Sequence, residues 1–330
     1  MSIAEAFKCK EFATNRPPER IFVHSSERLP GVEFWTVTES TRRWSMHHDT
    51  FTAALLLGPT LQSRWHSRGC ARSAGAGSIQ LMEPGEVHHT MQLSEPANLF
   101  IIYWTPAALA RAAIEHGLED APHFKRPQID DPGLTLSLLR LQSSFRAGRA
   151  ADVEAAYTEC TRRLLGLAAL PPSDPATSTF HHPRMRRALE YIHDRFAEAI
   201  PLDVLAGRAN LSKFYFARSF RAMTGLAPHQ YQKLLRLQAA RRLLERGASV
   251  EAAASDFGFA DAPHLTRMFG AWLGISPATW ARGGQSSDVP PSLQLGPAFG
   301  GPSVSSSAAA TRNSDSTRMR AAARVAASDA

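Results

Sequence analysis

The most informative stretch of the chain is residues 202–220, LDVLAGRANLSKFYFARSF, which has the pattern of two short helices around a tight turn. Leu205 and Ala206 fall on the inner face of the first helix, and the small Ala206 lets a second helix approach closely. Asn210 stands at the turn, where a left-handed backbone is needed and asparagine tolerates it. Ser212 is then a natural N-cap for the second helix. The stretch therefore predicts a helix-turn-helix.

The same pattern returns in residues 250–269, VEAAASDFGFADAPHLTRMF. Here Gly258 ends the first helix and Asp261 caps the second. Residues 228–246 lie between the two units and have the apolar spacing of one continuous helix. At ~1.5 Å per residue this helix is about 28 Å long. That length is comparable to the ~34 Å between successive major grooves on one face of DNA.

Basic charge is concentrated in the same part of the chain. The formal net charge is +7 over 330 residues, with 37 Lys and Arg against 30 Asp and Glu. Residues 181–283 contain 15 basic and 8 acidic side chains, whereas residues 1–180 contain 18 and 19 and residues 284–330 contain 4 and 3. Clustered basic charge is typical of surfaces that bind phosphate backbones. A solvated basic face without a partner is the alternative.

Four sequence stretches connect this region with a known family. They are GFADAPHLTRMF at 258–269, GISPATWAR at 274–282, FRAMTG at 220–225 and RLQAARRLL at 236–244. With these stretches, residues 184–283 closely resemble the DNA-binding domain of the AraC/XylS family of bacterial transcription regulators. The resemblance implies an all-α domain of two helix-turn-helix units joined by a long helix, with double-stranded DNA as its partner.

The resemblance also implies which side chains contact DNA. The candidates for base-edge contacts are Phe214, Ala217, Arg218, Ala262, Pro263, His264 and Arg267. The candidates for phosphate contacts, or else for solvated surface, are Lys213, Arg221, Arg241 and Arg242. Arg218 and Arg267 are the strongest base-edge candidates, because arginine reaches guanine O6 and N7 with two hydrogen bonds. Phe214 fits either a thymine methyl contact or a packing role.

The sequence departs from the family pattern at Gly270, where the family usually has a basic residue. Ala217 and Ala262 also offer no side-chain hydrogen bonds. We therefore expect the second unit to contribute less to DNA recognition.

The first part of the chain has the signals of short strands. Predicted strands cover residues 32–37, 51–57, 78–82 and 99–104, which favours a sandwich or a small barrel. The stretch GAGSIQLMEPGEVH at 75–88 resembles, more loosely, the cupin-like effector domain of the same family. This resemblance implies a β-barrel around a small-molecule cavity, and hence a small-molecule effector of unknown identity.

Histidines of this region are the candidate effector contacts. The candidates are His47, His66 and His88, and structural or surface roles are the alternative. Adjacent histidines such as His47 and His48 point to opposite faces of a strand, so only one of them can face inward. The paired His-x-His with a following Glu, typical of metal cupins, is absent. We therefore expect neither a metal nor another cofactor.

Two longer helices follow the strands. One places Leu134, Leu138, Leu141 and Phe145 on one face, and the other does the same with Val153, Tyr157, Cys160 and Leu164. This apolar stripe either caps the barrel or meets a second subunit, and it is the basis for expecting a homodimer through these helices.

The domains expected from these patterns are a cupin-like domain at 1–170, a linker at 171–183, the DNA-binding domain at 184–283 and a disordered tail at 284–330. The fold class is thus α+β: a cupin-like barrel with trailing helices, then an all-α domain. No apolar run reaches the length of a membrane span, the N-terminus lacks an apolar signal core, and three scattered cysteines give no disulfide framework. We therefore expect a cytoplasmic protein with no membrane partner.

The leading hypothesis is a sequence-specific DNA-binding transcriptional regulator, not an enzyme, that responds to a small molecule. RNA polymerase is a further expected partner, and activation and repression both stay open. Two alternatives are a cupin-type metalloenzyme with an appended DNA-binding module and a constitutive DNA-binding protein without an effector.

Overall fold

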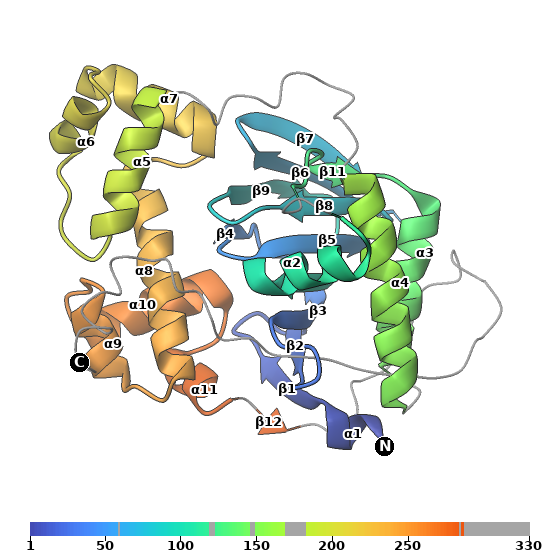
Figure 1. The fold of residues 1–330 in the computed structure, drawn as a ribbon. Helices are drawn as coiled ribbons and strands as arrows, with labels where there is room; N and C mark the ends of the chain where they lie inside the picture. The colour runs from blue at the N-terminus through green and yellow to red at the C-terminus, as the bar shows by residue number, and fades with distance from the viewer. Residues whose placement is uncertain (59, 119–122, 146–148, 169–182, 284, 287–330) are drawn as a thin grey trace.

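The computed structural model describes residues 1–58, 60–118, 123–145, 149–168, 183–283 and 285–286. These residues form two bodies, a strand domain on the right of Figure 1 and a helical domain on the left. The expected linker before Pro183 and the expected tail beyond Ser286 lie outside the described residues. Among the described residues, no helix is both long and apolar enough to cross a membrane.

The strand domain consists of two antiparallel sheets. The first has the order β11-β8-β5-β10-β3-β2-β1-β12, and the second has the order β4-β9-β6-β7. The strands are β1 Lys8–Ala13, β2 Arg20–Ser25, β3 Val32–Ser40, β4 Ser45–His47, β5 Phe51–Leu57, β6 Gln62–Ser67, β7 Cys70–Gly75, β8 Ile79–Met82, β9 Val87–Leu93, β10 Ala97–Trp104, β11 Gln128–Ile129 and β12 Gln285–Ser286. All four predicted strands are present, and the predicted 78–82 begins one residue later as β8.

The larger sheet is buried on both faces. Phe34 and Phe100 point to the helix-covered face, whereas Trp35 and Ile101 point to the opposite face. This alternation follows from the two-residue period of a strand. Burial on both faces explains why β5 is apolar along almost its whole length rather than at every second residue.

Helices α2 (Pro106–Glu115), α3 (Pro132–Ser144) and α4 (Ala150–Ala168) cover one face of the larger sheet. Figure 1 shows α3 and α4 side by side. Every residue of the predicted apolar stripe is buried in the core that these helices share with the sheet: Leu134, Leu138, Leu141, Phe145, Val153, Tyr157, Cys160 and Leu164. The stripe therefore caps the sheet within one chain. The residues of this stripe are therefore not available to contact a second subunit, and they do not support the homodimer that was predicted from them.

The helical domain has the predicted order of helices. They are α5 Pro183–Arg195, α6 Leu202–Arg208, α7 Lys213–Thr224, α8 Pro228–Glu245, α9 Val250–Asp256, α10 Ala262–Leu273 and α11 Pro277–Ala281. Helix α8 has 18 residues, which corresponds to about 27 Å. It ends one residue before the predicted limit, because Arg246 leaves helical geometry and serves as the C-cap.

The two domains share a continuous apolar core. Trp280 of α11 stacks on Phe12 of β1 with ring centroids 4.8 Å apart, and it lies 5.7 Å from Trp35 of β3. Gln285 and Ser286, which the sequence pattern had placed in the tail, form β12 and pair with β1. The helical domain is thus docked against the strand domain.

Candidate nucleic-acid interface

Helix α7 begins at a side-chain cap and ends at a glycine. The Ser212 hydroxyl accepts a hydrogen bond from the Tyr215 backbone N–H at 3.3 Å, as an N-cap should. Asn210 has φ +52°, which confirms the left-handed turn predicted there. Phe216 and Phe220 are buried against the rest of the domain. Burial of this face leaves the other side of α7 toward solvent.

Helix α10 is built in the same way. The Asp261 carboxylate accepts a hydrogen bond from the His264 backbone N–H at 2.6 Å. Gly258 has φ +69° in the turn before it, and Leu265 and Phe269 are buried. Both predicted helix-turn-helix units are therefore present, with the predicted caps.

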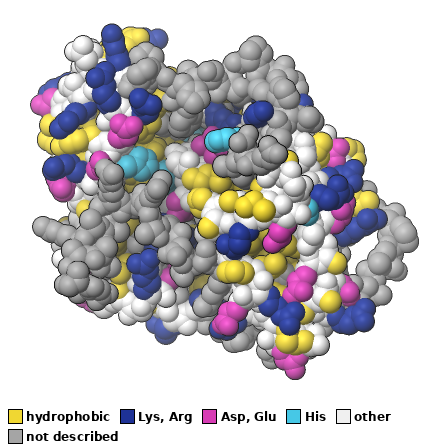
Figure 2. All heavy atoms as spheres, viewed as in Figure 1, with side chains coloured by type: hydrophobic (Ala, Val, Ile, Leu, Met, Phe, Trp, Pro, Cys, Tyr) yellow, Lys and Arg dark blue, Asp and Glu magenta, His cyan; other side chains and the backbone are white. Residues whose placement is uncertain are grey.

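The predicted base-edge residues lie on the solvent side of the first two turns of these two helices. Phe214, Arg218, Pro263 and Arg267 are exposed, and Ala217, Ala262 and His264 are half-buried. Phe214 is 78% exposed, which excludes a packing role for its ring in this chain. Lys213 and Arg221 are also exposed, and Lys213 forms an ion pair with Asp203 at 3.2 Å. Figure 2 shows Lys and Arg side chains gathered over the upper-left lobe, which Figure 1 identifies as α5, α6 and α7.

His264 is held in place by its own helix start. Its Nδ1 accepts a hydrogen bond from the Ala260 backbone N–H at 3.3 Å, and its ring meets the edge of Phe259 at 5.6 Å. Because Nδ1 is the acceptor, Nε2 carries the proton and is available as a donor.

Arg241 and Arg242 do not lie on this exposed surface, contrary to the phosphate role considered for them. Arg242 forms an ion pair with Asp49 of the strand domain, and burial lowers its pKa to about 10. The Arg241 guanidinium lies 5.7 and 5.6 Å from the ring centroids of Trp35 and Trp280. Their face of α8 packs on the strand domain, so acidic and aromatic groups of the protein replace water around both guanidinium groups.

Arg236, which the sequence pattern did not single out, joins separate parts of the helical domain. It donates hydrogen bonds to the carbonyls of Phe196 (2.7 Å) and Glu198 (2.8 Å) in the loop between α5 and α6, which leads into the first unit, and to that of Gly258 (2.5 Å) in the turn of the second unit. Gln232, one helical turn earlier, donates to the same two carbonyls of this loop. Burial lowers the pKa of Arg236. Arg236 therefore ties the two units to α8 and to each other.

Gly270, the departure from the family pattern, lies at the contact between the domains. The Asn15 side chain donates a hydrogen bond to the Gly270 carbonyl at 3.2 Å, and the Asn15 backbone N–H donates to the Gly274 carbonyl at 2.7 Å. A β-carbon at Gly270 would lie 3.9 Å from Asn15 Nδ2, an ordinary van der Waals distance. The strand domain thus caps the last turn of α10.

The three candidate effector histidines do not share one pocket. His88 hydrogen-bonds to His48 at 2.7 Å and lines a cavity of about 50 Å³ between the sheets. His47 hydrogen-bonds to Gln238 of α8 at 3.0 Å, whereas its neighbour His48, which lies beyond the end of β4, hydrogen-bonds to Thr52 and His88. His66 lies against Gly225, where an added β-carbon would be 2.7 Å from its Nδ1. Within the described ranges, no three His, Cys, Asp or Glu side chains form a metal site.

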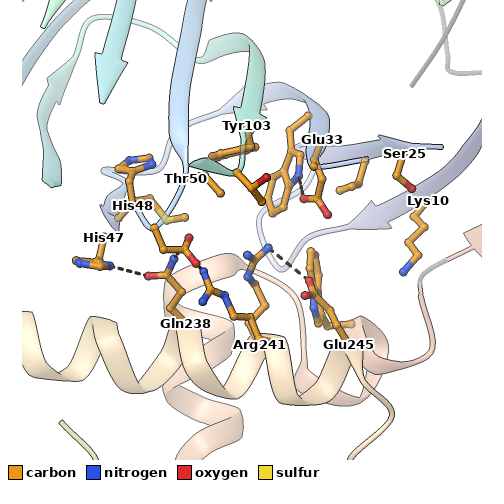
Figure 3. Close-up of a pocket in the computed structure, with 18 of the residues that line it drawn as sticks. Lys10, Ser25, Glu33, His47, His48, Thr50, Tyr103, Gln238, Arg241 and Glu245 are labelled. Carbon is orange, nitrogen blue, oxygen red and sulfur yellow. Dashed lines mark hydrogen bonds and ion pairs between the residues drawn. The ribbon is translucent and has the colours of Figure 1, made fainter. Parts of the chain in front are cut away.

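A larger cavity, which we call the interdomain cavity, separates the strand domain from α8. It measures about 340 Å³, and its lining includes Glu33, Trp35, Tyr103, Arg241 and Glu245 (Figure 3). No sequence pattern predicted this cavity, because its walls come from both domains.

Comparison with known proteins agrees with the geometry of the helical domain. The family model described as "Helix-turn-helix domain" matches residues 205–283. The HTH-type transcriptional activator RhaS of Escherichia fergusonii is 35% identical over 105 residues, which are 32% of this chain and 38% of that protein. The HTH-type transcriptional regulator YbfI of Bacillus subtilis is 31% identical over 81 residues, 24% of this chain and 30% of that protein. The chain therefore spans only about a third of the length of these relatives.

Two solved structures were also compared. The DNA-binding domain of AdpA, crystallised in complex with a target DNA, is 33% identical, with a TM-score of 0.29 over 30% of this chain and 90% of that one. ToxT of Vibrio cholerae O395 is 10% identical, with a TM-score of 0.42 over 84% of this chain and 98% of that one. Both TM-scores are below 0.5, so the assignment depends on the sequence matches and on the helix-turn-helix geometry. Through its helical domain, the chain belongs to the AraC/XylS family.

Proposed function

We propose that the protein is a sequence-specific DNA-binding transcriptional regulator that responds to a small molecule held by its strand domain. The observation that supports this most directly is the pair of N-capped helices, α7 and α10, whose first turns face solvent. Helix N-terminal residues are the ones that reach base edges when a recognition helix enters the major groove. Helix α8 is about 27 Å long. This length is comparable to the ~34 Å between successive major grooves on one face of DNA, where the two recognition helices would bind.

Arg218 and Arg267 are the proposed base-reading residues. Both are exposed, one on each recognition helix. Each guanidinium can form two hydrogen bonds with a guanine in the major groove. Phe214 is proposed to contact a thymine methyl group, and Lys213 and Arg221 to contact phosphates.

The test is selection of binding sites from random DNA, followed by affinity measurement on the selected site. We expect Arg218→Ala to weaken binding by about 1–3 kcal/mol and to relax the preference at one position of the site. Arg140→Ala, an exposed arginine of α3 on the strand domain, is the matched control and should leave affinity unchanged. An unaltered sequence preference in Arg218→Ala would refute the assignment.

The proposed response depends on how the domains are docked. Among the described residues, contacts from the strand domain reach the last turn of α10, the end of α7 and one face of α8, whereas the first turns of α7 and α10 are exposed or half-buried. A small molecule that binds the docked arrangement more tightly than the undocked one would shift the balance between the two. A second copy of the chain and RNA polymerase are proposed as further partners.

Ligand-induced thermal stabilisation distinguishes this proposal from the alternative of a constitutive DNA-binding protein that has no effector. A ligand at 100 times its dissociation constant stabilises the folded protein by about 2.7 kcal/mol. A broad metabolite screen that produces no thermal shift would therefore favour constitutive DNA binding.

A further inference from the structure

Two histidine rings meet across the boundary between the domains. His47 belongs to β4 of the strand domain and His193 to α5 of the helical domain, and their ring centroids are 5.2 Å apart. The His47 ring also meets the Tyr231 ring of α8 edge-on, with centroids 5.8 Å apart. Its Nδ1 hydrogen-bonds to Gln238, which Figure 3 shows rising from α8 toward it. All of these side-chain contacts are with the helical domain, so docking is what buries His47.

The hydrogen bonds around His47 define its tautomer. Gln238 donates from Nε2 to the Asp49 carboxylate at 2.6 Å, which leaves its Oε1 as the acceptor for His47. His47 Nδ1 therefore carries the proton, and Nε2 is a bare acceptor. This Nε2 is buried and has no hydrogen-bond partner among the described residues. A second proton, placed on Nε2, would be a buried donor without an acceptor.

Helix α8 faces the pair with a cation and a hydroxyl group. Arg242 repels a proton on His47, and its ion pair with Asp49 engages the carboxylate that is closest in the sequence. The Tyr231 hydroxyl hydrogen-bonds to His193 Nε2 at 2.9 Å. Burial raises the pKa of this hydroxyl, so it stays neutral and supplies no negative charge.

Helix α5 and the strand side complete the surroundings of the pair. The charged residues of α5 are all exposed to water: Arg184, Arg186, Arg187, Glu190, Asp194 and Arg195. Strand β9, which pairs with β4, and the residue after β4 add further histidines: His48, His88 and His89. A proton on the buried His47 would thus face histidines, a paired carboxylate and exposed carboxylates. These groups do not offset its charge.

Both rings are consequently neutral at pH 7. Burial lowers the pKa of His47 well below its ordinary value, and repulsion from His193 adds to this effect. Burial lowers the pKa of His193 to about 4, although Asp194 acts in the opposite direction. Neutral rings pack at 5.2 Å without electrostatic cost, whereas two imidazolium ions at that distance would repel each other.

We propose that His47 and His193 form a pH-sensitive switch, which holds the two domains together at neutral pH and separates them in acid. In the undocked arrangement His47 is in water and takes up a proton as the pH falls through about 6.5. The docked arrangement excludes this proton, so each pH unit below 6.5 weakens docking by up to about tenfold for each proton taken up. For one proton the loss at pH 5 is about thirtyfold. The effect of the switch on DNA binding rests on the proposed function.

Hydrogen exchange at two indole N–H groups tests the switch on the full chain by NMR. Trp272 Nε1 of α10 donates to the Ser45 carbonyl of β4 at 3.1 Å, so its protection factor reports docking. Trp104 Nε1 donates to the Tyr157 hydroxyl at 2.9 Å inside the strand domain, so it reports unfolding of that domain. We expect the Trp272 protection factor to fall by about thirtyfold or more between pH 7.5 and 5.0, and to stay below that of Trp104. An unchanged Trp272 protection factor overturns the proposal, as does one equal to that of Trp104, because the domains would then separate only on unfolding.

Substitutions that do not titrate show whether this pair is responsible. His47→Asn keeps an N–H donor for Gln238, and His193→Gln keeps a polar partner for Tyr231, so we expect the double variant to dock. Its Trp272 protection factor should change by less than about threefold over the same pH range, and His47→Asn alone should already reduce the fall to less than about tenfold. His229→Gln, at an exposed histidine of α8, is the control and should behave like the parent. The parent's pH dependence in the double variant, or in His47→Asn alone, overturns the proposal.

The same proteins separate this inference from the proposed function. Affinity for a selected DNA site is measured for the parent and the double variant at pH 7.5 and 5.5, so that effects of pH common to both cancel. A difference between their pH dependences supports the regulatory role, and identical pH dependences overturn that role. A chain that binds no DNA at all overturns the proposed function, and exchange at Trp272 still decides whether the switch exists.

Discussion

Arg236→Met should uncouple the two helix-turn-helix units while keeping each of them folded. Methionine has a similar length and no hydrogen-bond donor, so the substitution removes the bonds at 2.7, 2.8 and 2.5 Å to the carbonyls of Phe196, Glu198 and Gly258. At about 1 kcal/mol net for each bond, the coupling lost is about 2–3 kcal/mol. Helix α8 is then free to shift against the turn that precedes α10.

The assay compares two DNA probes, one with the full selected site and one with the half contacted by α10 scrambled. We expect Arg236→Met to lose about thirtyfold to a hundredfold in affinity on the full site, and much less on the scrambled one. Lys233→Met, a partly exposed lysine on the same helix, is the matched control and should match the parent on both probes. Circular dichroism at the assay temperature confirms that the variant is folded. Equal losses on the two probes would refute the coupling role of Arg236.

Two further predictions concern the strand domain. Leu138→Ala should lower the free energy of unfolding by about 2–5 kcal/mol, because Leu138 is fully buried between α3 and the sheet. Denaturant unfolding measures this loss. Sedimentation should show the same oligomeric state for the variant and the parent. If the variant instead dissociated from an oligomer without losing stability, the apolar stripe of α3 and α4 would be a subunit interface. His24 is buried against Phe145 with a pKa lowered to about 4 by desolvation, whereas an unfolded histidine titrates near pH 6.5. Between about pH 6.5 and pH 4 the unfolded chain therefore takes up a proton at His24 that the folded chain does not. The free energy of unfolding is unaffected by this proton above about pH 6.5, and it decreases by up to about 1.4 kcal/mol per pH unit as the pH falls toward 4. His24→Phe should make the unfolding free energy less dependent on pH in that window, and parallel pH profiles for parent and variant would contradict this.

The features that the sequence predicted well depend on local signals. Ser212 and Asp261 cap their helices because a short acceptor side chain meets free backbone N–H groups one turn later, whatever the rest of the chain does. Asn210 and Gly258 adopt positive φ because the turns need it. The starts of α7 and α10 and the turns before them followed from these few positions.

The features that were missed depend on contacts between residues far apart in the chain. Arg241 and Arg242 have the composition of a basic helix face, and only the position of Asp49 and Trp35, about 190–210 residues earlier, shows that this face is covered. The same holds for His47, which pairs with Gln238 rather than lining the space between the sheets. Periodicity indicates which face of a helix is apolar, but it does not indicate which polar face a second domain will cover.

For the proposed response, the position of the domain contact supplies a route by which the strand domain would affect DNA binding without touching DNA. Asn15 supplies hydrogen bonds to the Gly270 and Gly274 carbonyls, at the end of α10 opposite to its base-reading turn. The Gly270 carbonyl also accepts a hydrogen bond from the Gly274 backbone N–H at 2.9 Å, so Asn15 adds a second partner there and a partner for the Gly274 carbonyl just beyond the helix. Separation of the domains would expose both carbonyls to water. Under the proposed function, a change in docking would therefore act on the C-terminal end of α10, while its first turn stays free to enter the groove.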